Sequence, residues 1–134
     1  MLTEKTVSEC VFADGSKGTH EVSPNLQIWR NADGQLHNDG DRPAMILVGS
    51  TNNDKLPILI RLGWVYGNCS WYTNGKLDRK NGLPAYVCSD GNCQWYEDDK
   101  MLLQKYCSKH EIKKYKKPCI NKALGVLRRW WLLG

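Results

Sequence analysis

The sequence lacks the features that membrane and secreted proteins need. No stretch of about 18 apolar residues occurs, so no membrane-spanning helix and no membrane partner are predicted. The N-terminal segment Met1–Cys10 contains no apolar run, and we therefore expect no signal peptide. A protein made in a reducing cytoplasm keeps most of its cysteines as thiols, and we expect this of the six cysteines here.

Residues suited to catalysis are also scarce. The three histidines, His20, His37 and His110, stand in unrelated contexts with no nucleophile placed beside them. The acidic residues cluster at turn-like positions, and neither a Walker loop nor a dinucleotide-binding loop is present. We therefore predict that the protein is not an enzyme and uses no cofactor.

The cysteines of the C-terminal half leave two alternatives open. Cys88, Cys93, Cys107 and His110 could serve as zinc ligands, with Cys119 as a spare, although their spacing matches no common zinc finger. Cys88 and Cys93 flank an Asp-Gly pair and could instead form a cross-strand disulfide under oxidation. The default expectation is a pair of small buried thiols, and no metal site is predicted.

Charge is distributed unevenly along the chain. Residues 1–100 contain ten Lys/Arg and thirteen Asp/Glu, whereas residues 101–134 contain nine Lys/Arg and one Asp/Glu. The net charge of +5 therefore comes from the C-terminal segment, which suits an acidic protein surface, a phosphate backbone or a solvated helix face. The predicted binding residues are Lys113, Lys114, Lys116, Lys117, Arg128, Arg129 and Trp130.

The most informative feature that is present is an internal repeat. Residues 29–47 recur as residues 71–88, and a partial third copy begins at Trp95. Repetition at a fixed offset predicts similar units that each bury a face against the next. The matching positions are Gly34 and Gly75, Leu36 and Leu77, and Pro43-Ala44 and Pro84-Ala85.

Asp-Gly and Asn-Gly pairs punctuate the β-prone segments. Such pairs favour type I′ hairpin turns, which need positive φ at both central residues. Regular turns between short strands predict an antiparallel meander. An insertion between the copies is predicted to extend one hairpin, with strands at residues 45–49 and 58–64. The pairs occur at residues 14–15, 33–34, 74–75 and 90–91.

From Asp99 onward the apolar period becomes helical. Leu103, Cys107 and His110 recur at helical spacing, and Asp98 and Asp99 suit the cap and first turn. A second helix is predicted over residues 121–133, which carry one apolar stripe.

The fold class is therefore α+β. An antiparallel β-hairpin repeat sheet over residues 1–98 is followed by two short basic helices over residues 99–134, which pack on the sheet.

The second copy resembles a known viral repeat. Its segment Asn74-Gly-Lys-Leu to Gly-Leu-Pro-Ala85, followed by Trp95-Tyr96, is similar to the MORN-like units of phages and large DNA viruses. Their pattern is Trp/Tyr, Asn-Gly-Lys-Leu-His-Arg, two residues and Gly-Pro-Ala. His-Arg is replaced here by Asp78-Arg79 and by His37-Asn38, so no role of a paired His-Arg carries over. The resemblance implies stacked hairpins in a twisted antiparallel sheet and a viral source, and it supplies no activity.

We therefore expect a non-enzymatic viral interaction protein that binds a host or virion protein in the host cytoplasm. Inhibition of a host defence or another host machine would fit such a protein. Nucleic-acid binding through the basic C-terminal helices and a minor structural role in the virion are the alternatives. The sequence sets neither the identity of the partner nor the oligomeric state.

Overall fold

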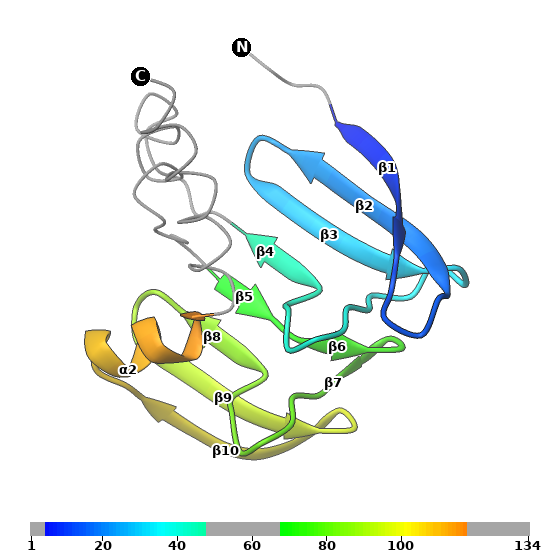
Figure 1. The fold of residues 1–134 in the computed structure, drawn as a ribbon. Coiled ribbons are helices and arrows are strands. Elements are labelled where there is room, and N and C mark those ends of the chain that lie inside the picture. Colours follow the sequence, from blue (N-terminus) through cyan, green and yellow to red (C-terminus); the bar gives the residue numbers. More distant parts are fainter. Residues whose placement is uncertain (1–4, 48–67, 118–134) are drawn as a thin grey trace.

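The computed structural model describes residues 5–47 and 68–117, which form an antiparallel sheet with a short helix at one end (Figure 1). Eight strands lie in the order β1-β2-β3-β4-β5-β8-β9-β10, and β6 and β7 form a separate hairpin. The broad α+β prediction is confirmed. The elements are β1 (Thr6–Val11), β2 (Lys17–Ser23), β3 (Leu26–Asn31), β4 (Met45–Leu47), β5 (Asn68–Ser70), β6 (Tyr72–Thr73), β7 (Lys76–Leu77), β8 (Tyr86–Cys88), β9 (Asn92–Glu97), β10 (Lys100–Tyr106) and α2 (Lys109–Tyr115).

The predicted turns occur, but most are not of type I′. At Asp14-Gly15 the glycine has a φ of +87°, the aspartate has no positive φ, and Gly15 N donates to Phe12 O at 2.9 Å. The pairs at 33–34 and 90–91 follow the same pattern. This bonding fits a type I turn followed by one left-handed glycine, which needs one positive φ instead of two. At residues 74–75 both φ values are positive, 48° and 85°, as type I′ requires.

The two repeat copies make the same backbone hydrogen bonds. Trp29 N donates to Ala44 O at 2.8 Å, and Trp71 N donates to Ala85 O at 2.7 Å. Both alanines are fully buried. The duplication read from the sequence therefore corresponds to a duplicated local structure.

The partial third copy contributes a turn of the same kind. Asp98 and Asp99 have φ values of 49° and 68° and take the place of residues 74–75. Gly75 N donates to Leu36 O at 2.8 Å, and Asp99 N donates to Leu77 O at 2.9 Å. Each turn thus bonds to the unit before it, which is how successive units stack.

The core lies where α2 meets the C-terminal half of the sheet. Cys69, Val87 and Cys93 are cross-strand neighbours on β5, β8 and β9, and all three are fully buried. Cross-strand neighbours share one face of a sheet. Ile112 of α2 packs on this face, and its burial contributes about 2 kcal/mol.

The helix predicted from Asp99 is wrong in its first half. Lys100–Tyr106 form β10, which pairs with β9, because the turn before it reverses the chain onto the preceding strand. The helix begins at Lys109 after a capping box. Ser108 Oγ accepts from Glu111 N at 3.2 Å, and Glu111 Oε1 accepts from Ser108 N at 3.2 Å. The sheet therefore extends past residue 98.

Some predicted elements lie outside the described residues. These are the second helix over residues 121–133, the strand at residues 58–64 and the end of the strand predicted at residues 45–49. The described part of the strand predicted at residues 45–49, Met45–Leu47, forms β4 between β3 and β5.

Candidate functional site

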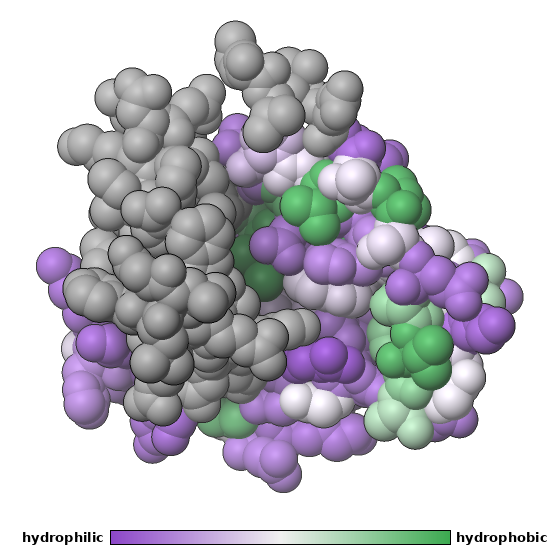
Figure 2. Space-filling model, turned by 45° about the horizontal axis from the view of Figure 1, so that its top comes forward, coloured by the Kyte–Doolittle hydropathy of each residue, from purple (hydrophilic) through white to green (hydrophobic). Residues whose placement is uncertain are grey.

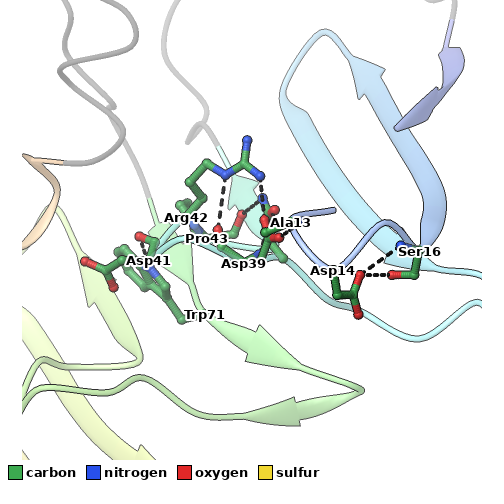
Figure 3. A network of polar contacts seen from close by, with 9 residues as sticks. Ala13, Asp14, Ser16, Asp39, Asp41, Arg42, Pro43 and Trp71 are labelled. Atoms are coloured by element: carbon green, nitrogen blue, oxygen red, sulfur yellow. Dashed lines mark hydrogen bonds and ion pairs between the residues drawn. The ribbon is translucent and has the colours of Figure 1, made fainter. Parts of the chain in front are cut away.

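Polar side chains gather where the first repeat unit meets the N-terminal hairpin (Figure 3). Asp39 accepts hydrogen bonds from Ala13 N and from Arg42 Nη2, the latter at 2.6 Å. Burial by itself would raise the pKa of Asp39, but these hydrogen bonds and the charge of Arg42 outweigh it and lower the pKa. The carboxylate is therefore ionised at neutral pH and ties two loops together.

A second polar joint connects the two repeat units. The buried Arg79 donates to Asp41 through Nε at 2.7 Å and through Nη2 at 3.1 Å. Its guanidinium carbon lies 3.8 Å from the centre of the Trp71 ring. Trp71 Nε1 donates to Asp41 O at 2.9 Å (Figure 3). Nη2 also donates to Tyr115 O at 2.9 Å. One side chain thus links two units and α2.

The first unit fills the equivalent place with a neutral side chain. Asn38 Nδ2 donates to Pro43 O at 2.9 Å, as Arg79 Nη1 donates to Pro84 O at 3.1 Å. Both side chains are buried. Because these groups bond within the fold, they act as structural joints and not as ligand-binding groups.

The thiols near α2 are arranged differently from the prediction. Cys93 pairs across the strands with Val87, so the predicted cross-strand pairing of Cys93 with Cys88 is wrong, and both cysteines are free thiols. Burial and the neighbouring Cys107 thiol raise the pKa of Cys93 to about 12. In the described ranges no three His, Cys, Asp or Glu residues group as a metal site, and Cys119 lies outside them.

The outer strand β10 is the main candidate for a binding surface. All of its residues are exposed, and the large apolar ones are exposed to unusual degrees: Met101 51%, Leu102 64%, Leu103 50% and Tyr106 73%. Within residues 5–47 and 68–117, no strand pairs with its outer edge. An edge strand presents backbone donors and acceptors to which another chain can bind.

Three of the predicted lysines lie exposed in or next to α2, namely Lys113, Lys114 and Lys117. Lys116 is buried, and its ammonium donates to Ser89 Oγ at 2.9 Å. That lysine helps to hold the helix on the sheet and is not part of the surface. Arg128, Arg129 and Trp130 lie outside the described residues.

The strand and the helix together form a basic surface. Residues 100–117 contain six exposed lysines, the buried Lys116 and one glutamate. Lys105 Nζ lies 4.0 Å from Glu111 Oε2 and 5.4 Å from the centre of the Trp95 ring. Half-exposed contacts of this kind are weak and leave the lysine available to another anion. We call β10 and the exposed lysines Lys109, Lys113, Lys114 and Lys117 the basic edge.

Sequence reasoning missed the apolar part of the basic edge because it placed residues 101–106 on a helix. A signal was present in Asp98-Asp99, which resembles the turn at residues 74–75 and therefore implies a strand on each side.

Figure 2 shows the hydrophobic residues of one face in separate patches among hydrophilic ones. None of the described helices has the length and apolar character needed to cross a membrane.

Comparisons with protein-family models, curated proteins and solved structures give no match.

Proposed function

We propose that this chain is a non-enzymatic viral interaction protein that binds a host or virion protein in the host cytoplasm. The observation that carries the proposal is the basic edge, in which the exposed Met101, Leu102 and Leu103 lie between Lys100 and Lys105 of the same strand. The resemblance of the repeats to MORN-like units supports a phage or large-DNA-virus source. Inhibition of a host defence or of another host machine is the role that suits a small viral binder.

The apolar residues favour a protein partner over a nucleic acid. Protein interfaces bury an apolar centre, in which methionine is enriched, within a polar rim. A phosphate backbone would engage the lysines and leave Met101 and Leu103 in water. An acidic protein surface with some apolar residues satisfies both parts of the basic edge.

Nucleic-acid binding is the second candidate. Tyr106 is 73% exposed and lies in the same basic strand, where its ring could stack on a base while lysines contact phosphates. A minor structural role in the virion is the third candidate, and it would use the same edge for assembly.

The surroundings of the titratable side chains support a non-catalytic role. A thiol with a pKa of about 12, such as that of Cys93, is protonated at neutral pH and is a poor nucleophile. His20 stacks on Trp29 with ring centres 4.1 Å apart, and His37 Nδ1 accepts a hydrogen bond from Asn74 N at 3.1 Å. Both imidazoles are held in place by contacts within the fold.

A capture experiment from host lysate tests the proposed function. The tagged full chain is compared with a triple variant, Lys113→Glu/Lys114→Glu/Lys117→Glu, and captured proteins are identified by mass spectrometry. Lys76→Glu/Lys80→Glu is the control, because these exposed lysines belong to neither β10 nor α2. We expect the triple variant to lose a protein that the wild type and the control retain. Equal capture by all three would reject the basic edge as the binding surface.

A titration with single-stranded and duplex DNA tests the second candidate. Binding through phosphates weakens steeply as the salt concentration rises, because bound counterions are released. Tight, salt-sensitive binding that the triple variant loses would assign the basic edge to nucleic acid instead of protein.

A further inference from the structure

The outer edge of β10 presents backbone groups in a defined order. Cys107 N donates to Gly91 O at 2.7 Å, and the register of β10 with β9 is unbroken from Leu103 to Tyr106. Inward and outward hydrogen-bonding groups alternate along an antiparallel strand. The N–H and C=O groups of Gln104 and Tyr106 therefore point away from β9.

The side chains of β10 divide between the two faces of the sheet. Lys105 lies opposite Cys93, on the face that α2 covers, and Leu103 shares that face because successive side chains alternate. Gln104 and Tyr106 belong to the other face. A further strand beside residues 103–106 would thus meet a leucine and a lysine on one face and a glutamine and a tyrosine on the other.

Two features of β10 disfavour pairing with β10 of a second copy of this chain. The strand carries Lys100 and Lys105, so β10 of another copy would bring like charges to the same edge. The register also breaks between Met101 and Leu103. Lysines and bulges on edge strands are devices that prevent self-pairing. An acidic strand meets no such repulsion.

Residues 48–67 and 118–134 of the chain do not complement the basic edge either. Residues 118–134 contain three basic residues and no acidic one, and residues 48–67 contain two basic residues and one acidic one. Charge complementarity therefore favours an acidic segment from another protein.

We propose that β10 binds an extended segment of a partner protein, with alternating acidic and apolar residues, as a ninth strand of the sheet. The segment pairs with the outward backbone groups of Gln104 and Tyr106, and its carboxylates lie beside Lys105. Backbone pairing supplies affinity, and the alternate side chains supply specificity. The inference rests on the proposed function and adds the chemistry of the partner and the way it docks.

A pair of synthetic peptides tests the chemistry. One alternates glutamate and valine, and the control alternates lysine and valine. We expect the glutamate peptide to bind the full chain and to slow amide exchange at Gln104 and Tyr106, and we expect added salt to weaken it. Absence of binding, equal binding of both peptides or protection confined to other strands would overturn the inference.

A substitution in β10 tests the geometry. Gln104→Pro removes an outward N–H, and proline is tolerated on an edge strand where its nitrogen faces solvent. Gln104→Val is the matched control, since it also loses the 2.8 Å side-chain bond to Asn92 but keeps the N–H. We expect the proline variant to bind the glutamate peptide about tenfold more weakly and the valine variant to bind it like the wild type. Equal binding by both variants contradicts a ninth strand.

A charge reversal covers the case in which the proline variant does not fold. Lys100→Glu/Lys105→Glu should lose the glutamate peptide and gain the lysine peptide, and an unchanged preference would overturn the inference.

The inference and the proposed function can fail separately. If Gln104→Pro still captures the host protein that the triple lysine variant loses, the ninth strand is wrong and the proposed function stands. If all variants capture it equally, the proposed function fails. If the wild type is a dimer that Gln104→Pro dissociates, the edge belongs to a second copy and the inference is overturned.

Discussion

Arg79 and Asp41 form a two-bonded ion pair, with a Nε–Oδ1 distance of 2.7 Å and a Nη2–Oδ2 distance of 3.1 Å, between loops 38 positions apart in sequence. The arginine side chain is 2% exposed and the aspartate side chain is 38% exposed. A guanidinium buried to this degree requires its carboxylate partner, because an unpaired buried charge is costly. The joint between the two repeat units is therefore sensitive to the loss of one negative charge.

Asp41→Asn should lower the free energy of unfolding by about 2 kcal/mol, below the full cost of breaking a buried pair because Asp41 is partly exposed. Asparagine tolerates the positive φ of 59° at this position, so the backbone is not strained further. Urea denaturation measures the change. Asp33→Asn removes an exposed turn carboxylate as a control and should change stability by less than about 0.5 kcal/mol. Similar losses in both variants would contradict a specific role of the pair.

Gly18→Ala should destabilise the N-terminal hairpin by about 3 kcal/mol or prevent folding. A Cβ atom at Gly18 would lie 2.6 Å from Phe12 Cε2 and closer still to Arg30 O, and a paired backbone cannot move aside. Gly15→Ala is the control. It strains a φ of +87° but meets no atom within 4 Å, so a loss of about 1 kcal/mol is expected. Thermal denaturation followed by circular dichroism compares the two, and an equal cost would show that packing at Gly18 is unimportant.

Acid should weaken the joint at Asp39. The pKa of Asp39 in the folded chain lies below the 3.8 of an unperturbed aspartate, so the unfolded chain binds a proton first as pH falls. The stabilisation is complete above the unfolded pKa and is lost as pH drops from about 3.8 through the folded value. Asp39→Asn should therefore lower stability at neutral pH and flatten its decline below pH 4, which denaturation at a series of pH values measures. If the stability of the variant falls below pH 4 as steeply as that of the wild type, Asp39 does not contribute to the acid sensitivity.

The sheet could be predicted in outline because its turns depend on local chemistry. Asn-Gly and Asp-Gly pairs supply the left-handed residues that hairpins need. They therefore mark where the chain reverses, whatever the order of the strands in the sheet. The exact turn type at residues 14–15 could not be read, because one or two positive φ values suit the same dipeptide.

The joints and the basic edge could not be predicted, since they depend on contacts between distant residues. Asn38 and Arg79 occupy equivalent places with unrelated side chains, so the alignment of the copies conceals their shared role. In the sequence, Lys116 looks like one of several surface lysines. Its burial becomes evident in the structure, where its ammonium contacts Ser89. Leu103 and Cys107 have helical spacing, yet pairing with β9 decides that Leu103 lies in a strand.

The Cys93 thiol should resist alkylation until the chain opens. It is fully buried, and its pKa of about 12 keeps it protonated even in mildly alkaline buffer. Iodoacetamide reacts with thiolates, so the partly exposed Cys88 and Cys107 should be labelled before Cys93 in the folded chain. Peptide mapping by mass spectrometry follows each site. In urea the difference should disappear, and labelling of Cys93 as fast as Cys88 under native conditions would contradict the burial.

Weakening the cap of α2 should speed that labelling if this helix controls access to Cys93. Ser108→Ala removes the side-chain acceptor of the capping box, a loss of about 1 kcal/mol that raises the population of the open helix about fivefold. Gly15→Ala, which should cost about the same 1 kcal/mol in the N-terminal hairpin, is the matched control and should leave the rate unchanged if α2 opens by itself. A rate for Cys93 that rises in the Ser108 variant alone assigns the opening to α2. Equal increases in both variants would instead mean that Cys93 is exposed by unfolding of the whole sheet, because that state gains population whenever the folded chain is destabilised.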